Sequence, residues 1–184
     1  MKVLLTSAGF QTDAIKDFFL ALLTKQPQNI KALFIPTAAV TPGAICVLPK
    51  CMNDLLKCGI KDEKIVVYDL HKPMPLESLQ QFDVVYICGG STEYLLERVN
   101  EQGFSNVLKD YMRNDGVVVG VSAGSMIAAQ NLENNLGLIS CHLYVHRSNG
   151  SQAGFIDVTN CGEISLTDEQ AVFLSDFNCA TIIQ

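Results

Sequence analysis

The segment from Gly120 to Gly124 reads Gly-Val-Ser-Ala-Gly and places Ser122 midway between two glycines. An apolar run, Val117 to Val119, precedes it, and a helix-like stretch from Ser125 to Gln130 follows it. Between a strand and a helix, such a sharp turn lifts the serine hydroxyl out of the chain, and tiny residues two positions away let the two elements approach. We therefore predict that Ser122 is a catalytic nucleophile. The alternative is an ordinary glycine-rich turn, as in a phosphate loop.

A nucleophilic serine also needs N–H groups that stabilise a developing oxyanion. Because a helix begins with free N–H groups and a positive dipole end, the Ala123 amide is predicted to be one donor. A second glycine turn, Gly89 to Thr92, ends the preceding strand, and both turns of an open parallel sheet lie at its carboxyl edge. The Gly90 amide is therefore predicted to be the other donor. The alternative for this turn is a helix cap.

The serine needs a base, and the chain has three histidines: His71, His142 and His146. His71 lies in a polar loop and is predicted to be a surface residue. His142 and His146 are four residues apart on a strand-like run, on one predicted face, and either could reach Ser122. With Cys141 they could also suggest a metal site, but no second Cys/His cluster completes one. We therefore predict no metal site.

The acid that would orient the base is predicted from chain order. Between Ser122 and His146 the one carboxylate is Glu133, within the polar turn Asn131 to Asn135. Glu133 is therefore the predicted third catalytic residue, and a solvated loop residue is the alternative.

These residues must be positioned by regular elements, and apolar runs alternate with helical patterns along the first two thirds of the chain. The runs are near-continuous, which is typical of parallel strands covered on both faces. The predicted strands are Val3 to Thr6, Ala32 to Ile35, Ile65 to Tyr68, Val84 to Cys88 and Val117 to Val121. The predicted helices are one after an Asp13 cap, one from Pro49 to Cys58 ended by Gly59, one after Thr92, and one capped by Ser105.

Strands that alternate with helices predict an α/β fold, a three-layer α/β/α sandwich of the flavodoxin-like type with about five parallel strands. After residue 137 the pieces become short and are broken by Gly, Asn and Asp. We predict that they form a short antiparallel extension of the same sheet. These pieces are His142 to Arg147, Gly154 to Val158, Ile164 to Leu166, Ala171 to Ser175 and Ala180 to Ile183.

Composition narrows the function classes. The chain has 184 residues, 48% of them apolar, which predicts a single domain over residues 1–184. Nineteen acids against 13 scattered bases give a net charge of −6, which argues against a nucleic-acid partner. No apolar run approaches the roughly 20 residues of a membrane span, and the opening run is too short for a secretory signal. We predict a cytoplasmic protein with no membrane partner.

The seven cysteines are odd in number and form no Cys-x-x-Cys pair. Free cysteine is among the most buried residue types, and the cytosol keeps thiols reduced. We therefore predict that all seven are reduced and buried.

Several segments, taken in their order along the chain, resemble the dipeptidase E and cyanophycinase family of serine peptidases, relatives of the class I glutamine amidotransferase-like fold. The likeness covers most of the chain, and the ordered set is more specific than the serine turn alone. The matching segments are Phe34 to Ala38, Ile87 to Thr92 followed by Leu95 and Leu96, Gly120 to Gly124, and Leu136 to Leu138 leading to His146.

The resemblance implies roles for particular residues. Ser122 would be the nucleophile, His146 rather than His142 its base, and Gly90 and Ala123 the oxyanion donors. It also implies a cytoplasmic, cofactor-free hydrolase whose partner is a small peptide substrate.

The resemblance further implies a preference for an N-terminal aspartate, which requires a cationic pocket. Arg147, beside the base, is the only Arg or Lys after Arg113 and is predicted to bind the substrate. Ser91, Thr92 and His142 are predicted as further substrate contacts.

Two departures from the family pattern support an alternative function. Ser91 stands where the family usually has Asn, and the stretch from Ser122 to Gly137, which carries the acid in dipeptidase E, is shorter here. The alternative is a catalytically impaired domain that binds an anion or small ligand at helix N-termini. It predicts an unstrained serine and imidazoles beyond hydrogen-bond reach. The sequence leaves the oligomeric state open.

Overall fold

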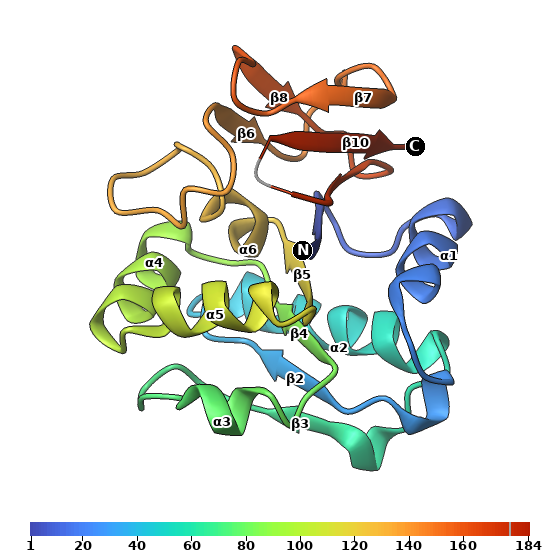
Figure 1. The fold of residues 1–184 in the computed structure, drawn as a ribbon, viewed down its shortest axis with the longest axis vertical. Helices are drawn as coiled ribbons and strands as arrows, with labels where there is room; N and C mark the ends of the chain where they lie inside the picture. Colours follow the sequence, from blue (N-terminus) through green and yellow to red (C-terminus); the bar gives the residue numbers. More distant parts are fainter. Residues whose placement is uncertain (177) are drawn as a thin grey trace.

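In the computed structural model, which describes residues 1–176 and 178–184, two sheets carry the fold (Figure 1). The strands of the large sheet are β1 (Lys2–Thr6), β2 (Ala32–Ile35), β3 (Ile65–Val67), β4 (Val84–Ile87), β5 (Val117–Val121), β7 (Gly154–Asp157), β9 (Ala171–Leu174) and β10 (Cys179–Ile183). Their order is β3-β2-β4-β5-β1-β9-β10-β7. The small sheet pairs β6 (His142–Tyr144) with β8 (Glu163–Ser165).

The first five strands are parallel, as predicted. Their register aligns the carboxyl ends of the three central strands, because Thr6 pairs with Val121 and Ile87 pairs with Gly120. The residues that follow β1, β4 and β5 therefore emerge side by side at one edge of the sheet.

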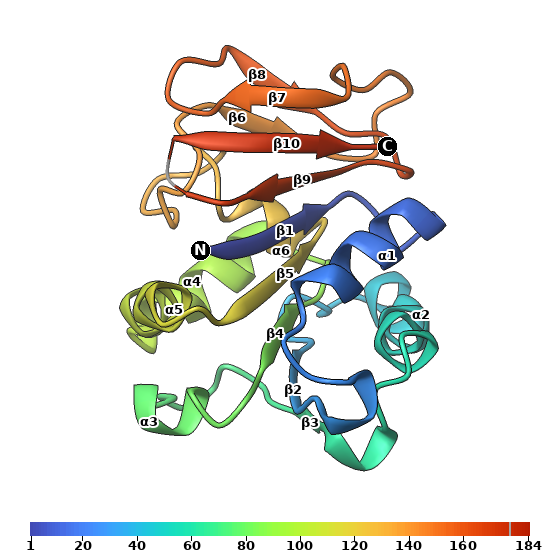
Figure 2. The same cartoon turned by 45° about the vertical axis from the view of Figure 1, so that its right-hand side comes forward.

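Helices cover both faces of the large sheet, which confirms the three-layer α/β/α prediction (Figure 2). Successive strand residues point to opposite faces. Leu4 packs with Ile15 and Phe19 on one face, whereas Leu5 packs on the other with the helices that follow β4. The helices are α1 (Asp13–Leu22), α2 (Pro42–Lys57), α3 (Leu76–Leu79), α4 (Thr92–Glu101), α5 (Phe104–Arg113) and α6 (Ala123–Met126), with short 3₁₀ turns at Pro27–Asn29 and Asp62–Lys64.

Of the predicted helices, α2 differs most from the structure, because it begins at Pro42 and not at Pro49. The Thr41 hydroxyl accepts the Ala44 N–H at 3.2 Å, and Pro42 takes the first helical position, where its missing N–H costs nothing. Pro49 therefore lies inside the helix. The end of the helix, before Gly59 with φ 86°, is as predicted.

Two predicted caps are displaced by one or two residues. The side chain of Thr12, and not Asp13, caps α1 by accepting the Ile15 N–H at 3.3 Å. Gly103 with φ 63°, and not Ser105, precedes α5. Thr12 satisfies an N–H of the first turn with its side chain, whereas Gly103 makes no such bond and starts its helix through the left-handed conformation that glycine adopts readily.

The C-terminal pieces extend the large sheet through β9, β10 and β7, all in antiparallel pairs, as predicted. The prediction was wrong for β6 and β8, which leave that sheet and pair with each other in parallel. Their central residues, Leu143 and Ile164, are fully buried in the same core cluster as Ile127, just after α6. The strands therefore cover the region of the serine turn instead of lengthening the sheet.

The prediction that all seven cysteines are reduced and buried was wrong. Cys141, just before β6, forms a disulfide with Cys161, just before β8. Parallel pairing brings the starts of these strands together and leaves the two Cα atoms 5.7 Å apart. The other cysteines are free, and Cys46 is exposed.

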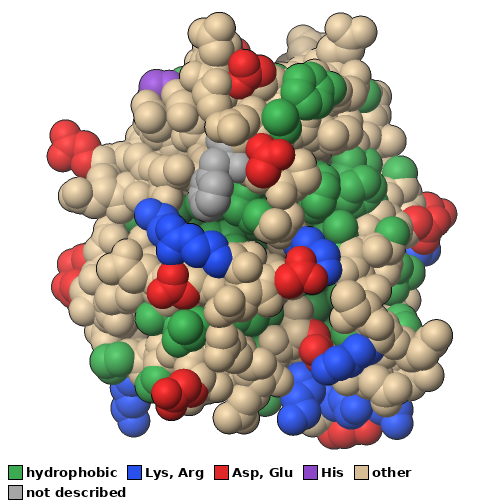
Figure 3. Space-filling view, in the orientation of Figure 1, with side chains coloured by type: hydrophobic (Ala, Val, Ile, Leu, Met, Phe, Trp, Pro, Cys, Tyr) green, Lys and Arg blue, Asp and Glu red, His purple; other side chains and the backbone are tan. Residues whose placement is uncertain are grey.

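The surface carries both signs of charge. On the face shown in Figure 3, Lys and Arg side chains lie among Asp and Glu side chains and apolar ones. None of the described helices is long and apolar enough to cross a membrane.

Candidate active site

The serine turn has the predicted strand–turn–helix geometry. Ser122 follows β5 directly, and its backbone has φ 50° and ψ −108°, a conformation that L-residues rarely adopt. A Cβ on Gly120 would lie 2.6 Å from the Gly124 carbonyl oxygen, so this position requires glycine. The helix that follows is shorter than the predicted 125–130 stretch, because α6 ends at Met126 and turns succeed it.

The end of β1 holds this turn in place. The Thr6 carbonyl accepts the Ser122 N–H at 3.0 Å and the Ser125 hydroxyl at 2.8 Å. The Thr6 hydroxyl donates to the Gly120 carbonyl at 3.1 Å. These bonds are buried, so the strained serine is fixed by its surroundings.

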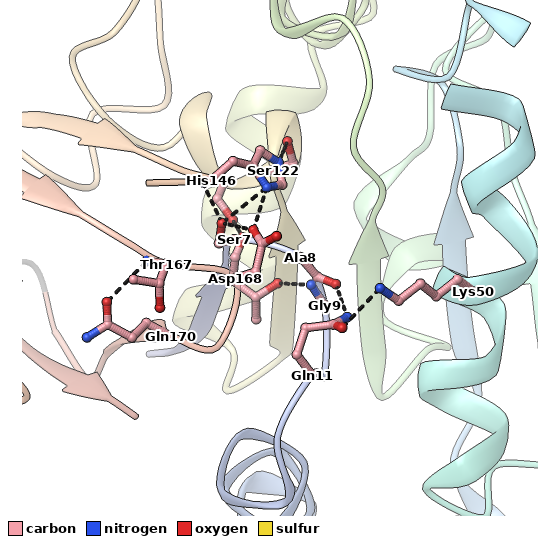
Figure 4. Close-up of polar contacts among 12 residues, drawn as sticks. Ser7, Ala8, Gly9, Gln11, Lys50, Ser122, His146, Thr167, Asp168 and Gln170 are labelled. Atoms are coloured by element: carbon pink, nitrogen blue, oxygen red, sulfur yellow. Dashed lines mark hydrogen bonds and ion pairs between the residues drawn. The ribbon is translucent and has the colours of Figure 1, made fainter. Parts of the chain in front are cut away.

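The imidazole beside the serine belongs to His146. Its Nε2 atom lies 3.0 Å from the Ser122 Oγ, and the residue follows β6 with φ 56° (Figure 4). His142 is exposed and stacks on Tyr144, with ring centroids 6.1 Å apart. The two histidines do not share a strand face, because β6 ends at Tyr144 before His146 turns away. His71 is exposed, as predicted.

The carboxylate on the imidazole is Asp168, and the prediction of Glu133 was wrong. The Asp168 Oδ1 atom lies 2.6 Å from the His146 Nδ1. Glu133 is exposed in its polar turn and is not among the hydrogen-bond partners of His146 in the described part of the chain. Chain order misled the prediction, because parallel pairing of β6 and β8 brings together the residues that follow each strand. A polar residue just after the 164–166 run was the available signal.

The Asp168 carboxylate favours its ionised form. Partial burial raises its pKa, but hydrogen bonds from His146 and Ser7 outweigh that effect and leave the pKa below its ordinary value. The positive charge of Lys50 lowers the pKa further. An ionised Asp168 can hold the proton of His146 on Nδ1 and leave Nε2 free to accept from Ser122.

The two predicted oxyanion donors lie in turns that meet. A Cβ on Gly89 would lie 3.0 Å from the Ser122 Cβ, so the turns after β4 and β5 are in contact. Gly90 has φ 144°, and any Cβ there would collide with the Ala38 carbonyl. Within residues 1–176 and 178–184, neither the Gly90 nor the Ala123 N–H donates to a protein acceptor. Their role as oxyanion donors remains a prediction.

A cleft of about 600 Å³ opens beside Ser122, between the strand ends and the first half of α2. The helix contributes an apolar wall with one cation, Lys50, whose Nζ donates to Gln11 Oε1 at 3.0 Å (Figure 4). The lining residues are Ser7, Ala8, Thr41, Gly43, Ala44, Val47, Leu48, Lys50, Cys51, Gly89, Gly90, Ser91, Val121, Ser122, His146 and Asp168.

Of the four predicted substrate contacts, the cleft includes Ser91 but not Thr92, Arg147 or His142. The Arg147 guanidinium instead lies 5.7 Å from the ring centroid of Tyr144. It misses the cleft because the chain turns at His146 and directs neighbouring side chains apart. The sequence did not identify Lys50 as a cleft residue. The predicted helix began at Pro49, so most of the half of α2 that lines the cleft beside Ser122 was left out of the prediction.

A buried carboxyl anchors the α2 wall. Asp54 accepts the Phe10 N–H at 3.0 Å and the Tyr86 hydroxyl at 2.5 Å. Burial raises the pKa of Asp54 above its ordinary value. These bonds tie α2, which forms one wall of the cleft, to β4 and to the loop after β1.

The described residues contain no group of three or more His, Cys, Asp or Glu side chains arranged to hold a metal ion. Cys141, which the sequence offered as a ligand beside His142 and His146, is bonded to Cys161.

Comparison with known proteins adds the family. The model of peptidase family S51 matches residues 3–140, most of the chain and the whole serine turn. The chain belongs to peptidase family S51. His146 and Asp168 lie beyond the S51 match, so their place in the site is known from the geometry.

Among the relatives of this chain, the uncharacterized peptidase PM1590 of Pasteurella multocida is 25% identical over 106 residues, 58% of this chain and 51% of that protein. Peptidase E of Salmonella arizonae is 26% identical over 132 residues, 71% of this chain and 56% of that protein. The chain thus spans little more than half the length of these relatives.

Two solved structures share the fold. A putative peptidase E from Listeria monocytogenes EGD-e has a TM-score of 0.69 at 19% identity and covers 94% of this chain and 93% of its own. A peptidase from an acI-B1 Actinobacterium has a TM-score of 0.65 at 15% identity, covering 98% and 84%. At these identities the likeness supports the fold.

Proposed function

We propose that this S51 family member is a serine peptidase that cleaves small peptides through an acyl-enzyme on Ser122. The observation that carries the proposal is the continuous contact from the Ser122 Oγ to His146 at 3.0 Å and from His146 to Asp168 at 2.6 Å. A nucleophile, a base and an orienting acid in this order form the constellation of serine hydrolases.

The reaction proceeds in two halves. The Ser122 Oγ bonds to the scissile carbonyl carbon while its proton passes to His146 Nε2, and the Gly90 and Ala123 amides stabilise the oxyanion. The C–N bond then breaks, and His146 returns the proton to the departing amine. Water attacks the acyl ester, gives its proton to His146, and releases the carboxyl product as Ser122 regains its hydrogen. Asp168 stabilises the imidazolium in both halves.

The alternative of a catalytically impaired binding domain predicts an unstrained serine and distant imidazoles. The serine has φ 50°, and His146 is within hydrogen-bond reach of it. Both features favour the catalytic proposal.

A fluorophosphonate tests this proposal without knowledge of the substrate. We expect it to label native protein at Ser122, because the His146 base makes that hydroxyl reactive, and not to label Ser122→Ala or heat-unfolded protein. Mass spectrometry of the tryptic peptides locates the adduct. The proposal fails if the native protein is unlabelled, or if Ser122→Ala hydrolyses dipeptides at the native rate.

For the substrate we propose peptides with an acidic N-terminal residue, of the Asp-X kind. Lys50 is the cationic side chain of the cleft and can pair with a substrate carboxylate. We expect Lys50→Gln to lower kcat/KM for Asp-Leu by about tenfold or more and to spare Leu-Leu. Lys57→Gln, on the same helix but outside the cleft, is the control. Equal losses on both dipeptides would reject this substrate class.

A further inference from the structure

The end of β1 is the junction between the nucleophile and its base. In the sheet, β1 lies between β5 and β9, so Thr6 pairs with Val121 on one side and with Ala171 on the other. Ser122 follows Val121 directly, and Asp168 precedes Ala171 by three residues. The residue after Thr6, Ser7, therefore lies where the two halves of the site meet.

Ser7 uses its hydroxyl on both partners of the serine. It is fully buried, and its Oγ accepts the His146 backbone N–H at 2.7 Å. The same Oγ donates to Asp168 Oδ1 at 3.1 Å and lies 3.5 Å from His146 Nδ1 (Figure 4). One hydroxyl has one proton and two lone pairs, so these contacts match its whole capacity.

These contacts matter because the base and the acid are exposed. The side chains of His146 and Asp168 have relative exposures of 50% and 58%, so packing alone does not fix their rotamers. His146 also has φ 56°, which a non-glycine residue adopts only when its surroundings hold it. The bond from its N–H to a buried hydroxyl supplies that hold.

We propose that Ser7 is a positioning residue of the active site, which holds the His146 backbone and the Asp168 carboxylate in the geometry that activates Ser122. This inference rests on the proposed peptidase function. Ser7 acts through His146 and Asp168, the two residues that its hydroxyl contacts.

Loss of the Ser7 hydroxyl should also change how the reactivity of Ser122 depends on pH. The direction of this change follows from the hydrogen bond that Ser7 donates to Asp168. A donor on the Asp168 carboxylate favours its charged form, so loss of the Ser7 hydroxyl raises the pKa of Asp168 and lets that carboxylate bind a proton more readily. The charged groups that face Asp168 are His146 and, from α2, Lys50, and both remain in a Ser7 variant. The acid limb of Ser122 reactivity should therefore move to higher pH.

The test uses two variants and one matched control. Ser7→Ala removes the hydroxyl, and Ser7→Cys keeps the shape with only a weak donor. Thr37→Val is the control, because the buried Thr37 hydroxyl likewise accepts an N–H, from Leu70 at 2.9 Å, and donates to a carboxylate, Asp69 at 2.6 Å, outside the cleft. All three are compared by melting temperature, by fluorophosphonate labelling across pH, and by the proton NMR signal of the His146 Nδ1–H.

We expect Ser7→Ala to label about tenfold more slowly, with its acid limb at higher pH and a shifted or lost Nδ1–H signal. Ser7→Cys should be intermediate, and it decides by the same criteria if Ser7→Ala does not fold. Thr37→Val should lose melting temperature but keep the native rate and profile. Ser7 variants with the native rate, or with a slower rate but an unchanged profile and NMR signal, overturn the inference while the peptidase proposal stands. Native protein that is not labelled overturns both.

Discussion

Among single residues, the main departure from the prediction is the carboxylate that contacts His146, which belongs to Asp168 and not to Glu133. The imidazole takes its carboxylate from a residue 22 positions after it, at 2.6 Å. We expect Asp168→Asn to lower kcat at least about a hundredfold, because an amide can present its NH2 to Nδ1 and favour the wrong tautomer. Glu133→Gln is the control and should stay within about twofold. Steady-state dipeptide hydrolysis measures both, and the reverse ranking would restore Glu133.

The lowered pKa of Asp168 also has a consequence for stability. A carboxyl whose pKa is lower in the folded state stabilises the fold above its unfolded pKa, and this contribution is lost as pH falls through the folded pKa. Asp168→Asn should therefore be less stable than the native protein at neutral pH, and this stability gap should narrow at acidic pH, as the pH falls through the lowered pKa of Asp168. Urea unfolding at both pH values measures the gap, and a constant gap would contradict this sign.

At the scale of elements, β6 and β8 position the proposed base and the proposed acid. They pair in parallel with Leu143 opposite Ile164, so His146 and Asp168 both follow strand ends that lie together. The Cys141–Cys161 disulfide joins the starts of the two strands, at the ends away from His146 and Asp168, and its cysteines are 20 residues apart in the sequence. The bond therefore clamps the short sheet that carries two of the three proposed catalytic residues.

Reduction should accordingly loosen the site. We expect dithiothreitol, or the double change Cys141→Ala with Cys161→Ala, to lower the free energy of unfolding by roughly 3 kcal/mol and to slow Ser122 labelling. Cys46→Ala, which removes an exposed free thiol, should respond to dithiothreitol as the native protein does. Thermal melting and fluorophosphonate labelling, with and without reductant, measure both effects. Native protein that is fully reduced yet unchanged in both would refute the clamp.

The same disulfide bears on location. Disulfides are rare in cytosolic proteins, where glutathione and thioredoxin keep thiols reduced. The disulfide is therefore unusual for the cytoplasmic location that we expect from the sequence. That location stays a prediction.

On the scale of the whole molecule, stability comes from two apolar clusters on opposite faces of one sheet. Phe19 is fully buried in one of them, whereas Phe155 on the edge strand β7 is 73% exposed. We expect Phe19→Ala to cost roughly 3–5 kcal/mol of unfolding free energy and Phe155→Ala about 0.5 kcal/mol or less. Urea denaturation of the two variants makes the comparison. Equal costs would mean that Phe155 is covered in solution.

The sequence by itself determined the architecture and the place of the turn that carries Ser122. Alternation of apolar runs with helical patterns is a local property, and it predicted the parallel strands and the three layers. The Gly-x-Ser-x-Gly turn is also a local feature, because its strained serine and the small residues that it requires lie within five consecutive positions. Ser122 and the turn at Gly90 therefore lie where the pattern predicted.

Only the tertiary structure decided which side chains surround Ser122. Asp168, Ser7 and Lys50 reach the cleft through the β6–β8 pairing, the register of β1 and the start of α2. Each of these depends on contacts between segments far apart in the chain. Burial of apolar faces and completion of backbone hydrogen bonds select such contacts, and no short stretch of sequence encodes them.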